Sequence, residues 1–204
     1  FNHVRDFQAT DRWPTVFLCD PHPRKSHVLL WVMVDPSDDL WVVADGQVDG
    51  DPVDVRKFSL DIERNLGLNV VQRYIDPNMG RSPASTRRGI TWQDEFQEAG
   101  LVCVCADDAA VGRQALNQYL KPDAARWQPR IHIHPRCELT AFQLSRHVWQ
   151  DRKLGSERAL LQVPKDLHDD TCALLKYLMN SKPGFTWLSG MGQIYRRKGR
   201  KGAY

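Results

Sequence analysis

The sequence of 204 residues predicts an α/β fold in which a mixed five-stranded sheet carries helices on both faces. Two observations lead to this prediction. Short apolar runs rich in β-branched residues alternate with amphipathic runs of helical period. A turn of hairpin length joins the second strand to the third, whereas a helix separates the third from the fourth, so both antiparallel and parallel pairs are expected.

The first three strands are expected over residues 15–20, 27–34 and 40–44. The turn-rich stretch Asp35-Pro-Ser-Asp-Asp39 separates the last two, which should therefore be antiparallel neighbours. The run Trp31-Val-Met-Val34 has no polar face. Such a run is typical of a central strand that is covered on both sides.

An amphipathic helix is expected over residues 53–66, with Val55, Phe58 and Ile62 on one face and Gly67 at its end. A strand, a loop, a helix and a fifth strand should follow, over residues 70–75, 77–90, 91–99 and 101–105. Beyond them we expect helices over residues 109–120, 138–150 and 171–179, a strand-like alternation over 130–137 and a short strand over 160–163. The order of the first five strands and their helices is that of the ribonuclease H-like fold.

Composition indicates an ordinary globular protein, with 42% hydrophobic and 26% charged residues and a net charge of +3. We expect a linker segment over residues 1–14, one domain over 15–183, and an irregular segment with a basic tail over 184–204. The first residue is Phe1 rather than Met, which is compatible with a piece of a longer chain. No signal peptide, transmembrane-length run or lipidation motif is present, which favours a soluble intracellular protein without a membrane partner.

The five cysteines are an odd number and form no CxxC pair. Four of them lie in apolar runs and are expected to be buried free thiols of a reducing compartment. These are Cys19, Cys103, Cys105 and Cys172. A zinc site built from His132, His134 and Cys137 with Cys103 and Cys105 is an alternative, but the ligand spacings typical of structural zinc are absent.

Aspartates stand at three places that the fold should bring together. Asp20 closes the first strand, Asp76 closes the fourth, and Asp169 and Asp170 stand where the last helix begins. In a ribonuclease H-like sheet the ends of the first and fourth strands are adjacent, and a later helix presents a carboxylate to the same spot. Such a cluster repels itself unless a cation neutralises it, and hard divalent cations prefer carboxylate oxygen. The simpler alternative for the helix start is an ordinary acidic cap.

Four stretches of the chain resemble the C-terminal nuclease domain of the large terminase subunit of tailed bacteriophages, an ATP-driven motor protein that cuts concatemeric DNA and packages it. They span nearly the whole sequence. The stretches are Asp11-Arg-Trp-Pro14 with Val16-Phe-Leu-Cys-Asp20, Tyr74-Ile-Asp76, Ile133-His-Pro-Arg-Cys137, and Pro164-Lys-Asp-Leu-His-Asp-Asp170 before Ala173-Leu-Leu-Lys-Tyr177.

This resemblance implies a metal-dependent endonuclease that cuts double-stranded, concatemeric viral DNA with little sequence specificity. Asp20, Asp76 and Asp170 would be catalytic and would hold two Mg²⁺ or Mn²⁺ ions, which activate the attacking water and stabilise the leaving oxygen. Asp169 would be a further metal ligand. Many members place an Asp where this chain has Cys172-Ala-Leu, so the third acid is placed earlier, and Asp169 and Asp170 both remain candidates.

Two neighbours of these acids, Lys165 and His168, could orient a water molecule or contact phosphate, although His168 could equally cap a helix or lie in the core. The resemblance also implies an upstream ATPase domain, because no GxxxxGK[ST] phosphate loop is present here. A portal protein and a small terminase subunit would be partners. The site of action would be the host cell cytoplasm and, transiently, the procapsid portal.

Two basic segments could contact DNA phosphates without reading bases, or could be a surface loop and a solvated tail. Neither is balanced by acids. Their residues are Arg81, Arg87 and Arg88 in the loop, and Arg196, Arg197, Lys198, Arg200 and Lys201 in the tail. The alternatives to a packaging nuclease are another ribonuclease H-like nuclease or resolvase, and a non-catalytic module that binds DNA or a portal.

Overall fold

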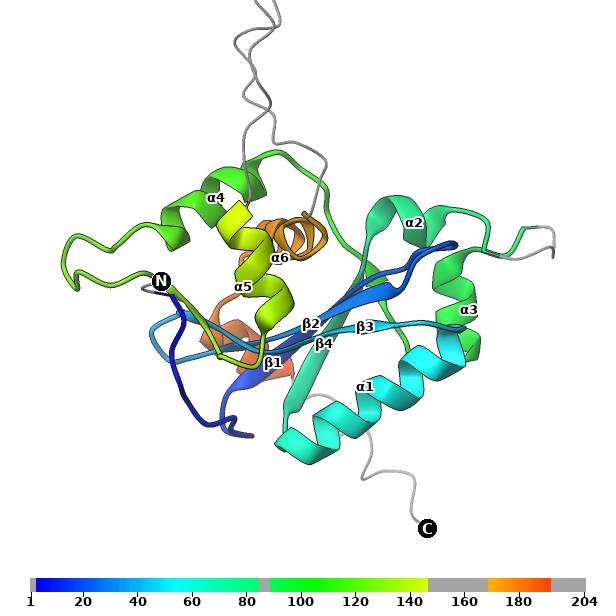
Figure 1. The fold of residues 1–204 in the computed structure, drawn as a ribbon, viewed down its shortest axis with the longest axis horizontal. Helices are drawn as coiled ribbons and strands as arrows, with labels where there is room; N and C mark the ends of the chain where they lie inside the picture. The colour runs from blue at the N-terminus through cyan, green and yellow to red at the C-terminus, as the bar shows by residue number, and fades with distance from the viewer. Residues whose placement is uncertain (1–2, 85–88, 147–168, 192–204) are drawn as a thin grey trace, which may run out of the picture.

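A mixed sheet forms the centre of the structure, a computed structural model that describes residues 3–84, 89–146 and 169–191 (Figure 1). Within these residues the sheet has six strands in the order β5-β4-β1-β2-β3-β6. The strands are β1 (Pro14–Asp20), β2 (His27–Val34), β3 (Leu40–Val48), β4 (Asn69–Ile75), β5 (Val104–Cys105) and β6 (Ile131–Ile133).

Helices cover both faces of the sheet, with α4, α5 and α6 on one side and α1 and α3 on the other (Figure 1). Residues 185–191 are helical as well. The helices with defined bounds are α1 (Pro52–Leu66), α2 (Pro77–Arg81), α3 (Trp92–Glu98), α4 (Val111–Leu120), α5 (Glu138–Arg146) and α6 (Asp170–Asn180).

The strand directions confirm the mixed ribonuclease H-like sheet. β1, β2 and β3 are antiparallel neighbours, and β1, β4 and β5 run parallel. The prediction of five strands was wrong by one, because β6 adds a parallel strand beside β3. The strand-like alternation was expected over residues 130–137, but β6 ends at Ile133, since Pro135 has no N–H to donate to a ladder.

The alternation of side chains along β1 divides the core into two layers. Phe17 points to the layer that contains Phe96 of α3, and Leu18 points to the layer that contains Leu175 of α6. All residues of β2 are buried, which confirms the prediction of a central strand covered on both sides. The sheet is therefore a rigid platform whose strand ends can hold side chains at fixed positions.

The helix predicted over residues 53–66 is confirmed as α1. Asp51 is its N-cap and forms a capping box with Asp54, whereas Gly67 ends it in the left-handed region at φ 62°. Other predicted elements differ from the structure, and the strand predicted over residues 40–44 continues to Val48 in β3. Part of the expected loop over 77–90 is helix α2. Asp76 is the N-cap of this helix, and Pro77 occupies its first position, where a missing N–H costs nothing.

The strand predicted over residues 101–105 shortens to β5. The carbonyl of Cys103 accepts a hydrogen bond from the side chain of Gln93 at 2.9 Å instead of pairing in the sheet. The expected irregular segment over residues 184–192 is helical over 185–191, where Leu188 is buried in the core. The predicted strand over 160–163 and residues 147–150 of the predicted helix lie outside the described residues.

The segment before β1 contacts the opposite edge of the sheet. Val4 forms an isolated parallel bridge with Ile133 of β6. Arg5 N donates to the Ile133 carbonyl at 2.9 Å, and Ile133 N donates to the carbonyl of His3 at 2.8 Å. Part of the predicted linker over residues 1–14 therefore lies along the sheet, and the boundary at residue 15 stays a prediction.

Candidate active site: a carboxylate cluster at one end of the sheet

Asp20 and Asp76 follow neighbouring parallel strands. Cys19 of β1 lies opposite Ile75 of β4, so the chain leaves both strands at the same end with an aspartate. The Asp76 N–H donates to the carbonyl of Cys19 at 2.8 Å, which fixes the two strand ends to each other. The topology thus brings together two acids that are far apart in the sequence.

Helix α6 brings two further acids to the same end. Asp170 is its first residue, and Asp169 is its N-cap, but the Asp169 side chain makes no capping hydrogen bond. Both carboxylates contribute to the electrostatic field at Asp20. The alternative of an ordinary acidic helix start stays open, because Asp170 lies in the first turn, although Asp169 makes no capping hydrogen bond.

The Asp76 carboxylate is held at both of its oxygens. Oδ1 accepts a hydrogen bond from the Met79 N–H at 2.6 Å, at the start of α2. Oδ2 accepts one from the Tyr177 hydroxyl at 2.5 Å. Asp76 is only 6% exposed, and each oxygen keeps a second lone pair for another partner.

The Asp170 carboxylate is oriented by a buried glutamine of α5. Gln143 donates from Nε2 to Asp170 Oδ2 at 3.1 Å, and its Oε1 accepts from both N and Oγ1 of Thr171 at 2.7 Å. The Thr171 N–H can only donate, so the amide orientation is fixed. Asp45 Oδ2 in turn accepts from Thr140 N at 2.7 Å, which anchors the start of α5 to β3.

Burial and neighbouring negative charges strongly raise the pKa of the Asp20 carboxyl. Burial is the largest cause that raises the pKa of its carboxyl from 3.8 to about 7. The negative charges of Asp76, Asp170 and Asp169 are the next causes, and Lys25 acts in the opposite direction. Within the described residues, no lysine or arginine forms an ion pair with Asp20, Asp76 or Asp170. A proton or a bound cation would therefore be favoured at Asp20.

The donor set fits a hard divalent cation in its chemistry. Carboxylate oxygens are the ligands that Mg²⁺ and Mn²⁺ prefer, and two of the acids have the neutral hydrogen-bond partners common around metal-binding carboxylates. Across residues 3–84, 89–146 and 169–191, however, no three acidic, histidine or cysteine side chains already form a ligand set. The charges of the acids therefore act on Asp20, but their side chains are not arranged as a complete set of metal ligands in the described residues.

Of the other predicted site residues, Arg81 lies in the described part of the chain. Arg81 is exposed at the end of α2, the short helix that begins just after Asp76. The remaining predicted residues lie outside the described part of the chain, and their roles stay predictions. They are Lys165, His168, Arg87, Arg88, Arg196, Arg197, Lys198, Arg200 and Lys201.

Sequence reasoning missed Tyr177, Gln143 and Lys25. Tyr177 follows Asp170 by seven residues, a spacing that places both on one face of a helix and could have signalled the contact. Lys25 lies five residues after Asp20 in the turn between β1 and β2. For Gln143 the sequence holds no signal, since only tertiary packing brings α5 against the start of α6.

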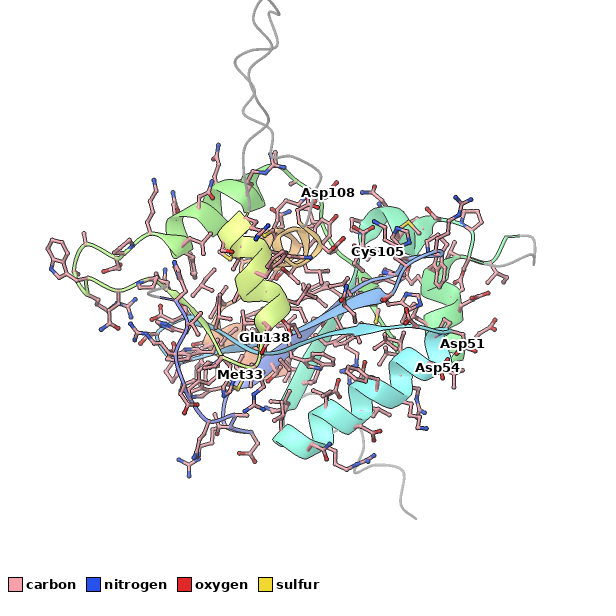
Figure 2. The ribbon with its side chains drawn as sticks, viewed as in Figure 1. Met33, Asp51, Asp54, Cys105, Asp108 and Glu138 are labelled. Carbon is pink, nitrogen blue, oxygen red and sulfur yellow. The ribbon has the colours of Figure 1, made fainter. Side chains whose placement is uncertain are left out.

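The alternative zinc site is not formed. His132 and His134 lie on or next to β6, whereas Cys103 and Cys105 lie in or beside β5 at the opposite edge of the sheet. Figure 2 shows Cys105 well separated from Glu138, the residue after Cys137. All five cysteines are free. Cys19, Cys103 and Cys172 are buried, as predicted, and so is Cys137. The prediction that Cys105 is buried was wrong, because it lies half-buried in the edge strand β5.

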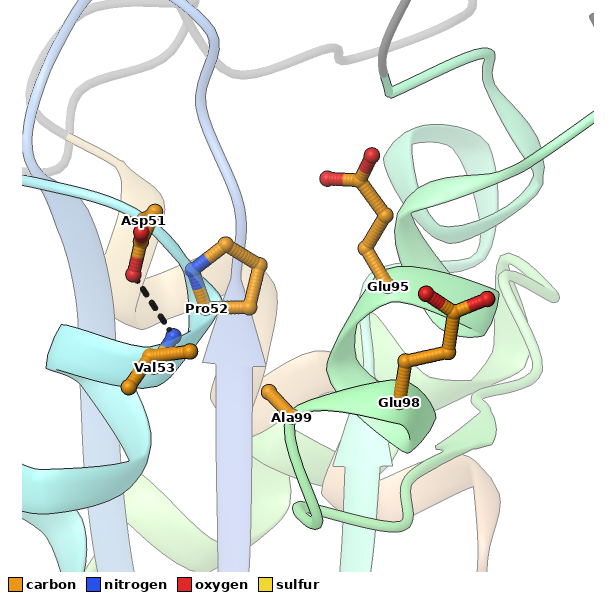
Figure 3. Close-up of a pocket in the computed structure, with 6 residues that line it drawn as sticks. All are labelled: Asp51, Pro52, Val53, Glu95, Glu98 and Ala99. Carbon is orange, nitrogen blue, oxygen red and sulfur yellow. Dashed lines mark hydrogen bonds between the residues drawn. The ribbon is translucent and has the colours of Figure 1, made fainter. Parts of the chain in front are cut away.

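A groove of about 320 Å³ lies between the start of α1 and helix α3. Asp51, Glu95 and Glu98 line it together with Pro52 and Ala99, and Figure 3 shows Asp51 engaged in its capping bond to the Val53 N–H. Since α1 and α3 cover the face of the sheet opposite α6, the groove is separate from the carboxylate cluster.

The order and directions of the strands define a ribonuclease H-like fold, with Asp20 and Asp76 at two neighbouring strand ends. Among solved structures, it is similar to the nuclease domain of the phage P22 large terminase, with 10% sequence identity, a TM-score of 0.62, and coverage of 89% of this chain and 88% of that one. At this identity the likeness establishes the fold of a terminase nuclease domain, as the sequence resemblance predicted.

The large terminase of the thermophilic bacteriophage D6E is similar as well, both in its crystal form 3 and in its complex with ADP. In each case the identity is 13% and the TM-score 0.61 over 88% of this chain. The chain spans 42% of the length of those terminases. No family model and no curated protein matches the sequence.

Within the described part of the chain, none of the helices combines the length and the apolar character needed to cross a membrane.

Proposed function

We propose that this chain is the nuclease domain of a DNA-packaging terminase, a metal-dependent endonuclease that hydrolyses phosphodiester bonds of double-stranded, concatemeric viral DNA with little sequence specificity. The observation that carries this proposal is the group of acids around Asp20, whose pKa is raised to about 7 by burial and by three neighbouring carboxylates. A ribonuclease H-like sheet with such acids at its strand ends suits phosphodiester chemistry.

Asp20, Asp76 and Asp170, with Asp169 beside them, are the residues that would hold two Mg²⁺ or Mn²⁺ ions. When bound, these ions would activate the attacking water and stabilise the leaving oxygen. The chain itself supplies negative charge at fixed positions. β1 and β4 fix Asp20 and Asp76, and Gln143 orients Asp170 through its amide.

Duplex DNA would bind by its phosphates over the same end of the sheet. Arg81 is exposed at the end of α2, the helix that begins directly after Asp76. The basic loop and tail would supply further positive charge for contacts with phosphates. The upstream ATPase domain, a portal protein and a small terminase subunit would be partners. The domain would act in the host cell cytoplasm and transiently at the procapsid portal.

Cleavage of supercoiled plasmid with Mn²⁺, Mg²⁺, Ca²⁺ or EDTA tests the proposal. We expect nicking and linearisation with Mn²⁺ or Mg²⁺ and none in EDTA. Asp20→Asn, Asp76→Asn and Asp170→Asn should each lower the rate at least ~100-fold while the protein stays folded, because they remove negative charge where the cations would bind. Asp61→Asn is the matched control, since Asp61 is a half-exposed acid on α1.

One observation favours the alternative of a non-catalytic module that binds DNA or a portal. The acids in the described residues do not form a closed ligand set. If folded protein that binds DNA cuts with none of these ions, the nuclease proposal is rejected in favour of this module. Comparison of Asp169→Asn with Asp170→Asn identifies which of the two acids is needed.

A further inference from the structure

Helix α6 delivers two different groups to the carboxylate cluster. Asp170 opens the helix, and Tyr177 lies two turns later on the same face. Tyr177 is 5% exposed, and its hydroxyl donates to Asp76, the residue that follows β4. One helix therefore sets the position of its own acid and the orientation of another.

Two fixed donors hold the plane of the Asp76 carboxylate. The Met79 N–H holds Oδ1, and the Tyr177 hydroxyl holds Oδ2. Both donors are neutral, so they restrain the carboxylate without cancelling its charge. The Asp76 side chain can then keep one orientation while it lies close to Asp20, a like charge that would otherwise push it away.

A second tyrosine, Tyr74, provides a comparison from the same core layer. Tyr74 of β4 is partly buried and packs against the same core layer as Tyr177, and the side chain that acts on its hydroxyl is that of Ser181. Ser181 is neutral and lies past the end of α6, away from Asp170. A neutral partner is therefore enough for a tyrosine hydroxyl in this core layer. Burial alone does not explain why Tyr177 donates to an acid of the cluster.

We infer that Tyr177 is a positioning residue, whose hydroxyl holds the Asp76 carboxylate in the orientation that ligates a divalent cation. This inference rests on the proposed function of the site. Removal of a partner that orients a metal ligand typically weakens metal binding about 10- to 100-fold. We expect the same of Tyr177→Phe, which removes only the hydroxyl and keeps the buried ring.

The test is a calorimetric titration of Mn²⁺ into the wild-type chain and three variants, with thermal unfolding in EDTA measured in parallel. Tyr177→Phe should raise the Kd for Mn²⁺ about 10- to 100-fold at an almost unchanged melting temperature. Tyr74→Phe, the matched control, should bind Mn²⁺ as the wild type does. Asp76→Asn should lose most of the binding.

The outcomes separate the inference from the function on which it rests. If Tyr177→Phe binds Mn²⁺ like the wild type, or if Tyr74→Phe weakens binding equally, the positioning role is rejected while the metal site stands. A Tyr177→Phe protein that no longer unfolds cooperatively in EDTA also rejects it, because the hydroxyl would then hold the fold. If the wild type binds no Mn²⁺, both the inference and the metal site are rejected.

Discussion

The two ends of the sheet both bury acids but neutralise them in different ways. At the turn between β2 and β3, Asp39 is 6% exposed and accepts hydrogen bonds from Arg126 Nη1 at 2.8 Å and Arg130 Nε at 2.9 Å. At the opposite end, the hydrogen-bond donors to Asp76 and Asp170 are a backbone N–H, a phenol and an amide.

An acid paired with arginines thus lies at one end of the sheet, and acids with only neutral donors at Asp76 and Asp170 lie at the other. The charge of Asp39 is compensated inside the folded chain by two arginines. The neighbouring acids help to raise the pKa of Asp20, and the neutral donors to Asp76 and Asp170 orient those side chains without adding positive charge. A buried acid with a raised pKa, such as Asp20, is typical of functional sites.

Removal of the paired acid should produce the largest loss of stability. Asp39→Ala leaves two partly exposed arginines without their shared partner, and we expect a destabilisation of about 3 kcal/mol because hydrogen bonds between charged groups are lost. Urea unfolding measures it. Asp61→Ala, which removes the half-exposed partner of Arg64, should change the free energy of unfolding by under about 1 kcal/mol. Equal losses in both variants would contradict the contrast between the two ends.

Cation binding should stabilise only through the carboxylate end. Mn²⁺ at 100 times its Kd should raise the free energy of unfolding of the wild type by about 2.7 kcal/mol, because the unfolded chain has no site. Asp39→Ala should show the same gain from its lower baseline, whereas Asp20→Asn should show almost none. Chemical denaturation with Mn²⁺ or EDTA provides the measurement, and a gain retained in Asp20→Asn would place the ion elsewhere.

The stability of the metal-free protein should depend on pH through Asp20. The raised pKa of about 7 means that the folded chain keeps this proton after the unfolded chain has lost it near pH 3.8. The contribution of Asp20 to the free energy of unfolding therefore falls as the pH rises from about 4 to 7 and stays low above 7. In EDTA at pH 8, Asp20→Asn should be more stable than the wild type by about 2 kcal/mol. The gain should vanish below pH 4, and a constant difference across this range would contradict the assignment.

The smallest effect is expected for one arginine of the structural end. Arg126 is 44% exposed, and Arg130 still binds Asp39 in its absence, so Arg126→Ala should cost about 1 kcal/mol. The double variant with Arg130→Ala should lose more than the sum of the two single losses, because Asp39 would then be buried alone. Urea unfolding of all three variants measures this, and strict additivity would show that the arginines act independently.

The sequence predicts much of the fold because its strands are marked locally. The unbroken apolar run of β2 and the caps of α1 are readable without tertiary information. β5 could not be predicted at its true length, since a side chain, Gln93, replaces the sheet partner of Cys103. α2 was missed because Asp76 was interpreted only as a strand end, although it also caps a helix.

In the candidate site, too, some residues can be predicted from the sequence and others cannot. Asp20 and Asp76 can be located because each directly follows an apolar strand, and the topology of the fold makes those ends neighbours. Gln143 could not be assigned, because its partner is reached across the core and not along the chain. The spacing of Tyr177 from Asp170 places it on the same helix face, but only the packing of α6 against the sheet shows that it contacts Asp76. Sequence therefore identifies the charges of the site better than it identifies what orients them.

The bridge between Val4 and Ile133 has a practical consequence for handling the protein. β6 is a three-residue strand at the edge of the sheet, and residues 3–5 lie along its outer side. Exposed strand edges are templates for intermolecular pairing and aggregation. A protein shortened to start at β1 would uncover this edge, so recombinant versions that keep the first 13 residues should stay monodisperse at concentrations where the shortened ones associate.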